Sequence, residues 1–158
     1  MLRNLLPKSS LLVWSAFFVL SACRFEGNML QSYRHLPDEG WCVDSLVYIP
    51  VPVADTTEAY DMTLRLRHTD DYPYSNLWLF VTAVAPDGTQ TVDTVNIPLS
   101  DEYGRWLGSG IGATMQREHL WRPSFRFGKS GLWHIVVQQG MRDSLLPGVT
   151  DIGLKVAR

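Results

Sequence analysis

The sequence predicts an all-β fold, an antiparallel β-sandwich of jelly-roll type, placed behind a lipoprotein signal peptide. Three observations favour this fold. Apolar and polar residues alternate with a period of two in several segments after residue 41. Turn-forming Gly, Pro and Asp residues separate these segments at short intervals. No window longer than about ten residues after residue 23 keeps the helical period of 3.6, and seven or eight short strands at this spacing are typical of a sandwich.

Strands are expected along the first half of the domain. A β-rich run covers residues 43–51 and is closed by Pro50 and Pro52. Residues 60–67 alternate apolar with polar side chains, which predicts a half-buried strand. Residues 77–85 (LWLFVTAVA) are apolar at nearly every position, which predicts a central strand covered on both sides. Pro86-Asp87-Gly88 predicts a turn, and residues 90–97 then complete a hairpin.

The second half is less regular. Four glycines within residues 99–112 indicate a loop or a bulged strand. A proline interrupts residues 119–127 and favours an edge position for that strand. Residues 132–138 and 151–156 each place their apolar side chains on one face. Residues 143–146 are predicted to form one short helical turn before Pro147-Gly148.

The N-terminal segment is typical of a secretory signal. Arg3 and Lys8 precede an apolar run at residues 11–20, which is shorter than the roughly 20 residues that cross a bilayer. The run ends in Leu-Ser-Ala-Cys, which resembles a bacterial lipobox with Cys23 as the lipidated residue. An ordinary signal peptide followed by a cysteine is the alternative. We therefore predict that the chain has three parts: a signal peptide at 1–22, a lipidated tether at 23–40 and a single β-sandwich domain at 41–158.

Composition narrows the class of protein. Fourteen Lys and Arg against sixteen Asp and Glu give a net charge of −2, which argues against a nucleic-acid binder. The chain has two cysteines. If Cys23 carries lipid, Cys42 is the remaining thiol and cannot form an internal disulfide. We interpret Cys42 as a small buried hydrophobic residue, with a reactive or intermolecular thiol as the alternative.

No catalytic or metal-binding motif is predicted. The acidic pair at 101–102 beside Trp106 is compatible with a glycosidase by composition, but neighbours on a strand point to opposite faces and cannot converge on one bond. His68, followed closely by two aspartates, is the nearest approach to a metal cluster, and the four histidines lack zinc-ligand spacing. We expect no enzyme activity, no metal and no cofactor.

Five residues are candidates for contact with a partner or ligand. Tyr72, Tyr74 and Asn76 lie in a turn centred on a Tyr-Pro dipeptide, which indicates either a structural turn or an aromatic recognition loop. Trp106 and Arg142 complete the set. Trp106 is expected to pack into the core unless it joins an exposed aromatic face, and Arg142 either forms a structural salt link or binds an acidic partner.

Four strings in this order, behind the lipobox, resemble one known family. They are residues 67–77 (RHTDDYPYSNL), 101–108 (DEYGRWLG), 138–142 (QQGMR) and 148–154 (GVTDIGL). Together they resemble the gliding-motility lipoprotein GldH family of Bacteroidota, and the resemblance covers essentially the whole chain.

This resemblance implies a cell-envelope lipoprotein that acts as a non-enzymatic structural or interaction component of the gliding and type IX secretion machinery. Its expected partners are the membrane, through the N-terminal lipid, and other envelope proteins, but not nucleic acid. A glycan-binding β-sandwich lipoprotein is the alternative. The residues after Cys23, Arg-Phe-Glu-Gly, lack the acidic run that resembles surface-export signals. We therefore expect an anchor in the outer membrane with the domain facing the periplasm.

Overall fold

A computed structural model describes residues 28–158, and all of its eleven regular elements are β-strands. The predicted signal peptide and Cys23 lie outside the described residues. The described part of the chain contains no helix that is long and apolar enough to cross a membrane. The helical turn predicted at 143–146 is wrong, because β10 (Leu145–Leu146) pairs there with β2 (Trp41–Cys42).

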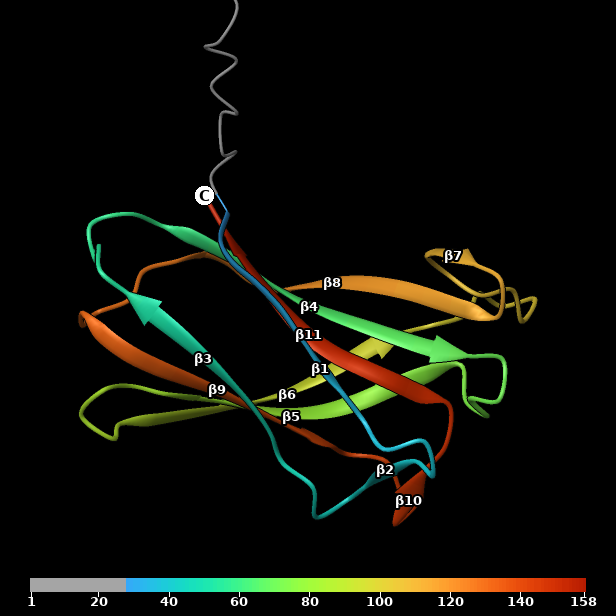
Figure 1. Ribbon diagram of the computed structural model, residues 1–158. Coiled ribbons are helices and arrows are strands. Elements are labelled where there is room, and N and C mark those ends of the chain that lie inside the picture. The colour runs from blue at the N-terminus through green and yellow to red at the C-terminus, as the bar shows by residue number, and fades with distance from the viewer. Residues whose placement is uncertain (1–27) are drawn as a thin grey trace, which may run out of the picture.

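Two large antiparallel sheets form the sandwich, and β10 with β2 makes a separate two-stranded sheet (Figure 1). The five-stranded sheet has the order β1 (Asn28–His35), β11 (Val149–Ala157), β4 (Tyr60–Thr69), β8 (Thr114–Phe125) and β7 (Ser109–Ile111). The four-stranded sheet has the order β3 (Val47–Val53), β9 (Gly131–Gln139), β5 (Asn76–Val84) and β6 (Gln90–Pro98). The all-β antiparallel sandwich predicted from the sequence is confirmed.

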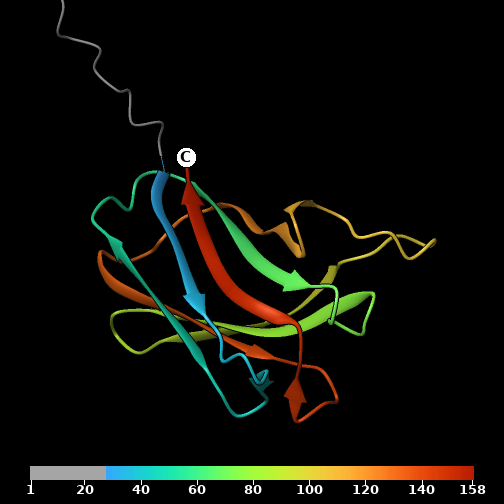
Figure 2. The same ribbon diagram turned by 45° about the vertical axis from the view of Figure 1, so that its right-hand side comes forward.

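The order of the strands is that of a jelly roll. If the eight long strands are counted along the chain, one sheet contains the first, eighth, third and sixth. The other sheet contains the second, seventh, fourth and fifth. This arrangement is a double Greek key, in which the chain passes from one sheet to the other between consecutive long strands, except at the β5–β6 hairpin. Strands distant in sequence, such as β1 and β11, therefore lie side by side, as both views show (Figures 1 and 2).

The core lies between the sheets and follows the predicted alternation. Strand β4 buries every second side chain, beginning with Tyr60, and strand β9 does the same from Trp133. Each fully buried aliphatic or aromatic side chain stabilises the fold by roughly 1.5–3 kcal/mol. The apolar faces predicted for residues 60–67, 132–138 and 151–156 are all buried.

Strand β1 corrects the predicted domain boundary. The sequence predicts a tether over residues 23–40, but Asn28–His35 pairs with β11, with Tyr33 opposite Gly153. β1 is an edge strand with one face in solvent, so it can carry polar residues that hide the period-two pattern. The sandwich therefore includes Asn28–His35, which the prediction assigned to the tether.

Two further expectations about strands are wrong. Pro50 and Pro52 do not close a strand but lie within β3, which is an edge strand where a missing N–H donor is tolerated. β5 was expected to be covered on both sides. It is a central strand of its sheet, but Trp78 and Phe80 on its outer face are 41% and 42% exposed.

Candidate functional site

Three loops meet at one end of the sandwich, which we call the distal end, where β4 ends and β11 begins (Figure 1). These loops are residues 70–75, 99–108 and 140–148. Backbone hydrogen bonds join them: the Leu99 N–H donates to the Ser75 carbonyl over 2.8 Å, and the Thr69 N–H donates to the Gly148 carbonyl over 2.8 Å. The start of β1 lies at the opposite end of the sandwich.

The buried ring of His68 is the centre of an aromatic cluster at the distal end. Its centroid lies 4.6 Å from the Trp106 ring and 5.8 Å from the Tyr72 ring. Tyr72 contacts Tyr74 at 6.0 Å, with the two ring planes at 73°. Tilted and edge-to-face contacts are the geometry in which aromatic side chains pack favourably. The cluster therefore joins the 70–75 and 99–108 loops to the end of β4.

Tyr72 is a structural residue, which corrects its prediction as a contact residue. It is 2% exposed, and its hydroxyl donates to the Asn76 carbonyl over 2.7 Å. Burial raises the pKa of this phenol well above its ordinary value. The Tyr-Pro turn is thus held from inside by the aromatic ring that the sequence placed on the surface.

Tyr74 and Trp106 are half-buried and use their polar atoms inside the molecule. The Tyr74 hydroxyl donates to a carboxylate oxygen of Asp143 over 2.7 Å, and this bond raises the pKa of Tyr74. The Trp106 indole N–H donates to a carboxylate oxygen of Asp70 over 2.9 Å. Each bond joins two different loops, so both aspartates serve as braces across the distal end.

The remaining predicted contact residues point in different directions. The side-chain N–H of Asn76 donates to the side-chain oxygen of Asn96 on β6 over 2.8 Å. Arg142 is exposed in the 140–148 loop and forms no salt bridge within residues 28–158. The structure therefore brings Tyr72, Tyr74 and Trp106 together as a packed cluster, while Arg142 alone presents a free charge to solvent.

His68 is held in its neutral form. Its Nδ1 donates to the Thr69 carbonyl over 3.1 Å, whereas its Nε2 is buried and has no hydrogen-bond partner in the described chain. Burial lowers the pKa of His68, because a proton on Nε2 would place an unpaired charge among the rings of the cluster. The packing of the aromatic cluster therefore requires His68 to be neutral.

Acidification is expected to destabilise the fold through His68. Below the unfolded-state pKa of about 6.5, the unfolded chain binds a proton that the folded chain excludes, so stability falls by up to about 1.4 kcal/mol per pH unit for this group. His119, whose pKa burial also lowers, adds a second contribution. Urea midpoints between pH 7.5 and 5 measure the slope. His68→Phe should flatten it, and an unchanged slope in this variant would contradict the assignment.

The two residues of the acidic pair at 101–102 have different surroundings. Asp101 braces its own loop, whereas Glu102 faces solvent. Asp101 accepts the backbone N–H groups of Tyr103 and Arg105, each over 2.9 Å, and the Arg105 N–H is the main cause of its lowered pKa. Glu102 is exposed. Within residues 28–158, no three His, Cys, Asp or Glu side chains gather closely enough to hold a metal ion.

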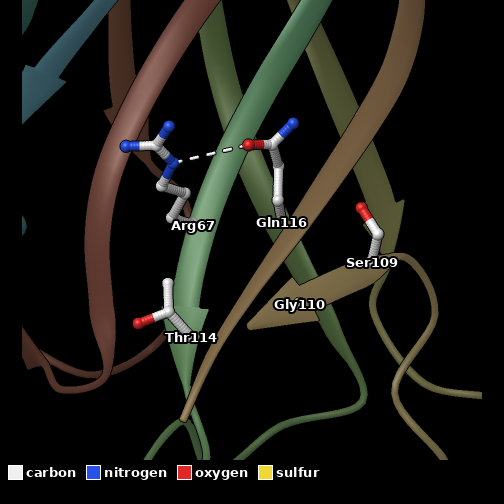
Figure 3. Close-up of a pocket in the computed structure, with 5 residues that line it drawn as sticks. All are labelled: Arg67, Ser109, Gly110, Thr114 and Gln116. Carbon is white, nitrogen blue, oxygen red and sulfur yellow. Dashed lines mark hydrogen bonds between the residues drawn. The ribbon is translucent and has the colours of Figure 1, made fainter. Parts of the chain in front are cut away.

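A shallow pocket of about 410 Å³ lies on the outer face of the five-stranded sheet, near the distal end (Figure 3). Arg67 lines it and its Nε lies 3.4 Å from the Gln116 side-chain oxygen. Arg67 also stacks on the ring of Tyr33 at 4.2 Å, and Arg65 lies 4.7 Å from the same ring. The two guanidinium groups therefore bracket a side chain of the edge strand β1, so Arg67 holds that strand onto the sheet.

The comparison with known families decides what kind of protein carries this site. A family model described as GldH lipoprotein matches residues 28–156, which includes β1 and both sheets. The chain belongs to the GldH lipoprotein family. This membership makes it a gliding-motility lipoprotein that is anchored to a membrane of the cell envelope, and it confirms the resemblance carried by the four sequence strings.

Curated relatives of this GldH-family chain come from two bacteria. The "Gliding motility lipoprotein GldH homolog" of Christiangramia forsetii is 32% identical over 125 residues, covering 75% of this chain and 77% of the relative. The "Gliding motility lipoprotein GldH" of Flavobacterium johnsoniae is 26% identical over 156 residues, covering 94% and 96%. The infectious bursal disease virus VP2 subviral particle aligns with a TM-score of 0.31 at 11% identity, over 84% of this chain and 31% of that one.

An exposed apolar surface of this GldH-family chain was not among the predicted sites. It is the outer face of the four-stranded sheet, where Tyr48 is 54% exposed beside Trp78 and Phe80. Sequence alone could not separate these residues from the core, because an apolar side chain on either face of a strand gives the same pattern. The signal was present in residues 77–85, whose outer positions are too apolar for a strand with one face in water.

Proposed function

We propose that this chain is a non-catalytic interaction component of the gliding machinery, anchored by lipid at Cys23 to the periplasmic side of the outer membrane. Its membership of the GldH family supports the place in that machinery. The lipobox supports the anchor, and the absence of an acidic run in residues 24–27 supports the periplasmic side.

One observation carries the non-catalytic role: three aspartates of the distal end are engaged as braces. Asp70 accepts from Trp106, Asp143 accepts from Tyr74, and Asp101 accepts two backbone N–H groups. A general acid or base must present its carboxyl group to a substrate within hydrogen-bond reach. These groups instead rigidify a surface from which Arg142 and Tyr103 protrude, and Tyr103 is 76% exposed.

Amide substitution tests this role. Asp70→Asn and Asp143→Asn keep an acceptor oxygen for the Trp106 and Tyr74 donors but remove acid–base chemistry. We expect both variants to restore full function in cells that lack the native chain, measured as colony spreading or envelope integrity. Asp70→Ala, which removes the brace, should lower the free energy of unfolding by about 0.5–1.5 kcal/mol, because Asp70 is exposed and water can reach the freed indole N–H. Loss of function in a stable Asn variant would instead indicate catalysis.

The glycan-binding alternative receives no support from the aromatic residues that suggested it. Stacking on a sugar requires exposed rings in a common plane, whereas Tyr72 is buried and its ring lies at 73° to that of Tyr74. Trp106 meets His68 edge-on, with planes at 65°. These rings face one another rather than the solvent.

A further inference from the structure

The outer face of the four-stranded sheet differs in charge from the outer face of the five-stranded sheet. Outward side chains of its strands include no Asp, Glu, Lys or Arg among residues 28–158. The outer face of the five-stranded sheet, in contrast, carries Arg65, Arg67, Glu118 and Lys155. Depletion of charge together with exposed aromatic side chains is the composition found at the centre of protein interfaces.

The uncharged face is hollowed rather than flat. A groove of about 490 Å³ runs across β3, β9 and β5. Exposed Leu46, Tyr48 and Phe80 line it together with the shorter Thr82, Val84 and Val136, and the polar side chains of Gln90, His134 and Gln138 complete the lining. Register places Tyr48 opposite Val136 and Val136 opposite Thr82, so these residues form one continuous row across three strands. A groove whose lining has no Asp, Glu, Lys or Arg is suited to a partner surface that protrudes and is mainly apolar.

The β3 edge of this sheet is unsuited to strand addition, because Pro50 and Pro52 remove N–H donors from it. On β6, Asp93 lies on the inward side with buried Val95 and accepts the Trp121 indole N–H over 2.9 Å and two guanidinium N–H groups of Arg122, so its charge is used between the sheets. The groove lies on the outward side, so a partner there binds the face of the sheet and does not extend it.

Shape argues against a second copy as the occupant. Two hollows placed against each other would leave unfilled space, and the side chains around that space would lose packing contacts. The lack of Lys and Arg on the face similarly disfavours an anionic lipid surface.

We infer that this groove binds the apolar side of an amphipathic helix presented by another envelope protein. The inference rests on the proposed interaction role and gives that role its partner. Three or four apolar side chains at helical spacing would lie on the Tyr48–Val136–Thr82 row, with Trp78 and Leu46 beside them. The uncharged groove matches the uncharged stripe of such a helix, and its polar side would remain in water.

Photocrosslinking in cells that carry the full-length chain tests the inference. Benzoylphenylalanine replaces Phe80 in the groove or, as a control, Leu120, which is 50% exposed on the outer face of the other sheet. We expect Phe80 to crosslink to an envelope protein, and the crosslinked peptide to carry apolar residues at spacings of three and four. Leu120 should not give that product.

A matched pair of substitutions then tests the groove itself. Thr82→Arg places a charge in the groove, whereas Thr63→Arg places one at a half-buried threonine on the outer face of β4. Thr82→Arg should lower the crosslinked product about tenfold or more, because an unpaired charge would be buried at the contact. Thr63→Arg should leave the product unchanged. Membrane sedimentation and an unchanged thermal transition verify that both variants fold.

Several outcomes would overturn the inference. These are a Phe80 product with the mass of two copies of this chain, a product with lipid only, a crosslinked peptide without helical spacing, or equal yields from Thr82→Arg and Thr63→Arg. If Phe80 gives nothing while a crosslinker at Tyr103 captures an envelope protein, the interaction role stands and the groove assignment fails. If no position captures a protein, both fail.

Discussion

Gly153→Ala is expected to lower the free energy of unfolding by about 3 kcal/mol, at the upper end for overpacking in a core. Gly153 lies in β11 between β1 and β4, opposite Tyr33 on one side and Arg65 on the other. A Cβ atom added there would lie 2.4 Å from the Ser32 carbonyl oxygen and 2.7 Å from the Tyr33 ring. No folded structure accommodates contacts this short without moving β1.

The loss of stability is large because the atom that the added Cβ would meet first is a backbone atom, the Ser32 carbonyl oxygen. The Tyr33 ring lies across Gly153, bracketed by Arg65 and Arg67, and could turn aside only by losing both cation–π contacts. The Ser32 carbonyl moves only if the strand moves. Removal of the ring in the double variant Tyr33→Ala/Gly153→Ala should therefore restore part of the stability and not all of it.

Gly128 provides a matched control. Nothing lies within 4 Å of a Cβ built there, so Gly128→Ala should be neutral or stabilising by up to about 1 kcal/mol. Urea unfolding gives the free energies, and hydrogen exchange should show the amides of β1 losing protection before those of β4. Equal midpoints for the two alanine variants would mean that β1 does not pack over Gly153 as described.

The local pattern of the strands was sufficient to predict the fold. Where a strand has one face in the core and one in water, as at residues 60–67, alternation identifies both the strand and its inward residues. The Pro86-Asp87-Gly88 turn was equally predictable, because Gly88 adopts a φ of 84° that glycine accepts most easily. Jelly-roll topology followed from strand number and spacing, and the observed pairing confirms it.

Strand β1 could not be predicted because its stability comes from distant residues. Asn28–His35 carries little apolar periodicity of its own, and its place depends on Gly153, Arg65 and Arg67, which lie at least 30 residues away in sequence. The same cause explains Tyr72. Composition placed it in a surface turn, whereas contact with His68 and a hydrogen bond to Asn76 turn it inward.

The prediction for the exposed face of the four-stranded sheet was wrong for another reason. The apolar pattern was recognised, but it was interpreted as a strand whose two faces are both buried within this chain. Residues 77–85 predicted a strand buried on two sides, yet the chain itself covers only the inner one. An exposed apolar patch on a folded domain is a common mark of a binding surface. The discrepancy at Trp78 and Phe80 is therefore what the proposed helix partner explains.

Cys23→Ala is expected to release the protein from membranes while leaving the sandwich folded. Each buried CH₂ of an acyl chain contributes roughly 0.8 kcal/mol to membrane binding, and a stable anchor needs two chains or a second signal. Within residues 28–158 no helix can replace that anchor. We therefore expect the variant to move from the envelope pellet to the soluble fraction after a salt wash, with the thermal transition of the domain unchanged.

Cys42→Ala is the matched control for this prediction, because it removes the other cysteine of the chain, a free and half-buried thiol on β2. It should remain in the pellet, and mass spectrometry should find acyl chains on residue 23. Residues 23–28 span at most about 18 Å when extended, so the lipid would hold the start of β1 close to the bilayer and the distal end away from it. A Cys23→Ala variant that stays in the pellet would show that lipid is not the anchor, and digestion by protease in intact cells would place the domain outside the periplasm.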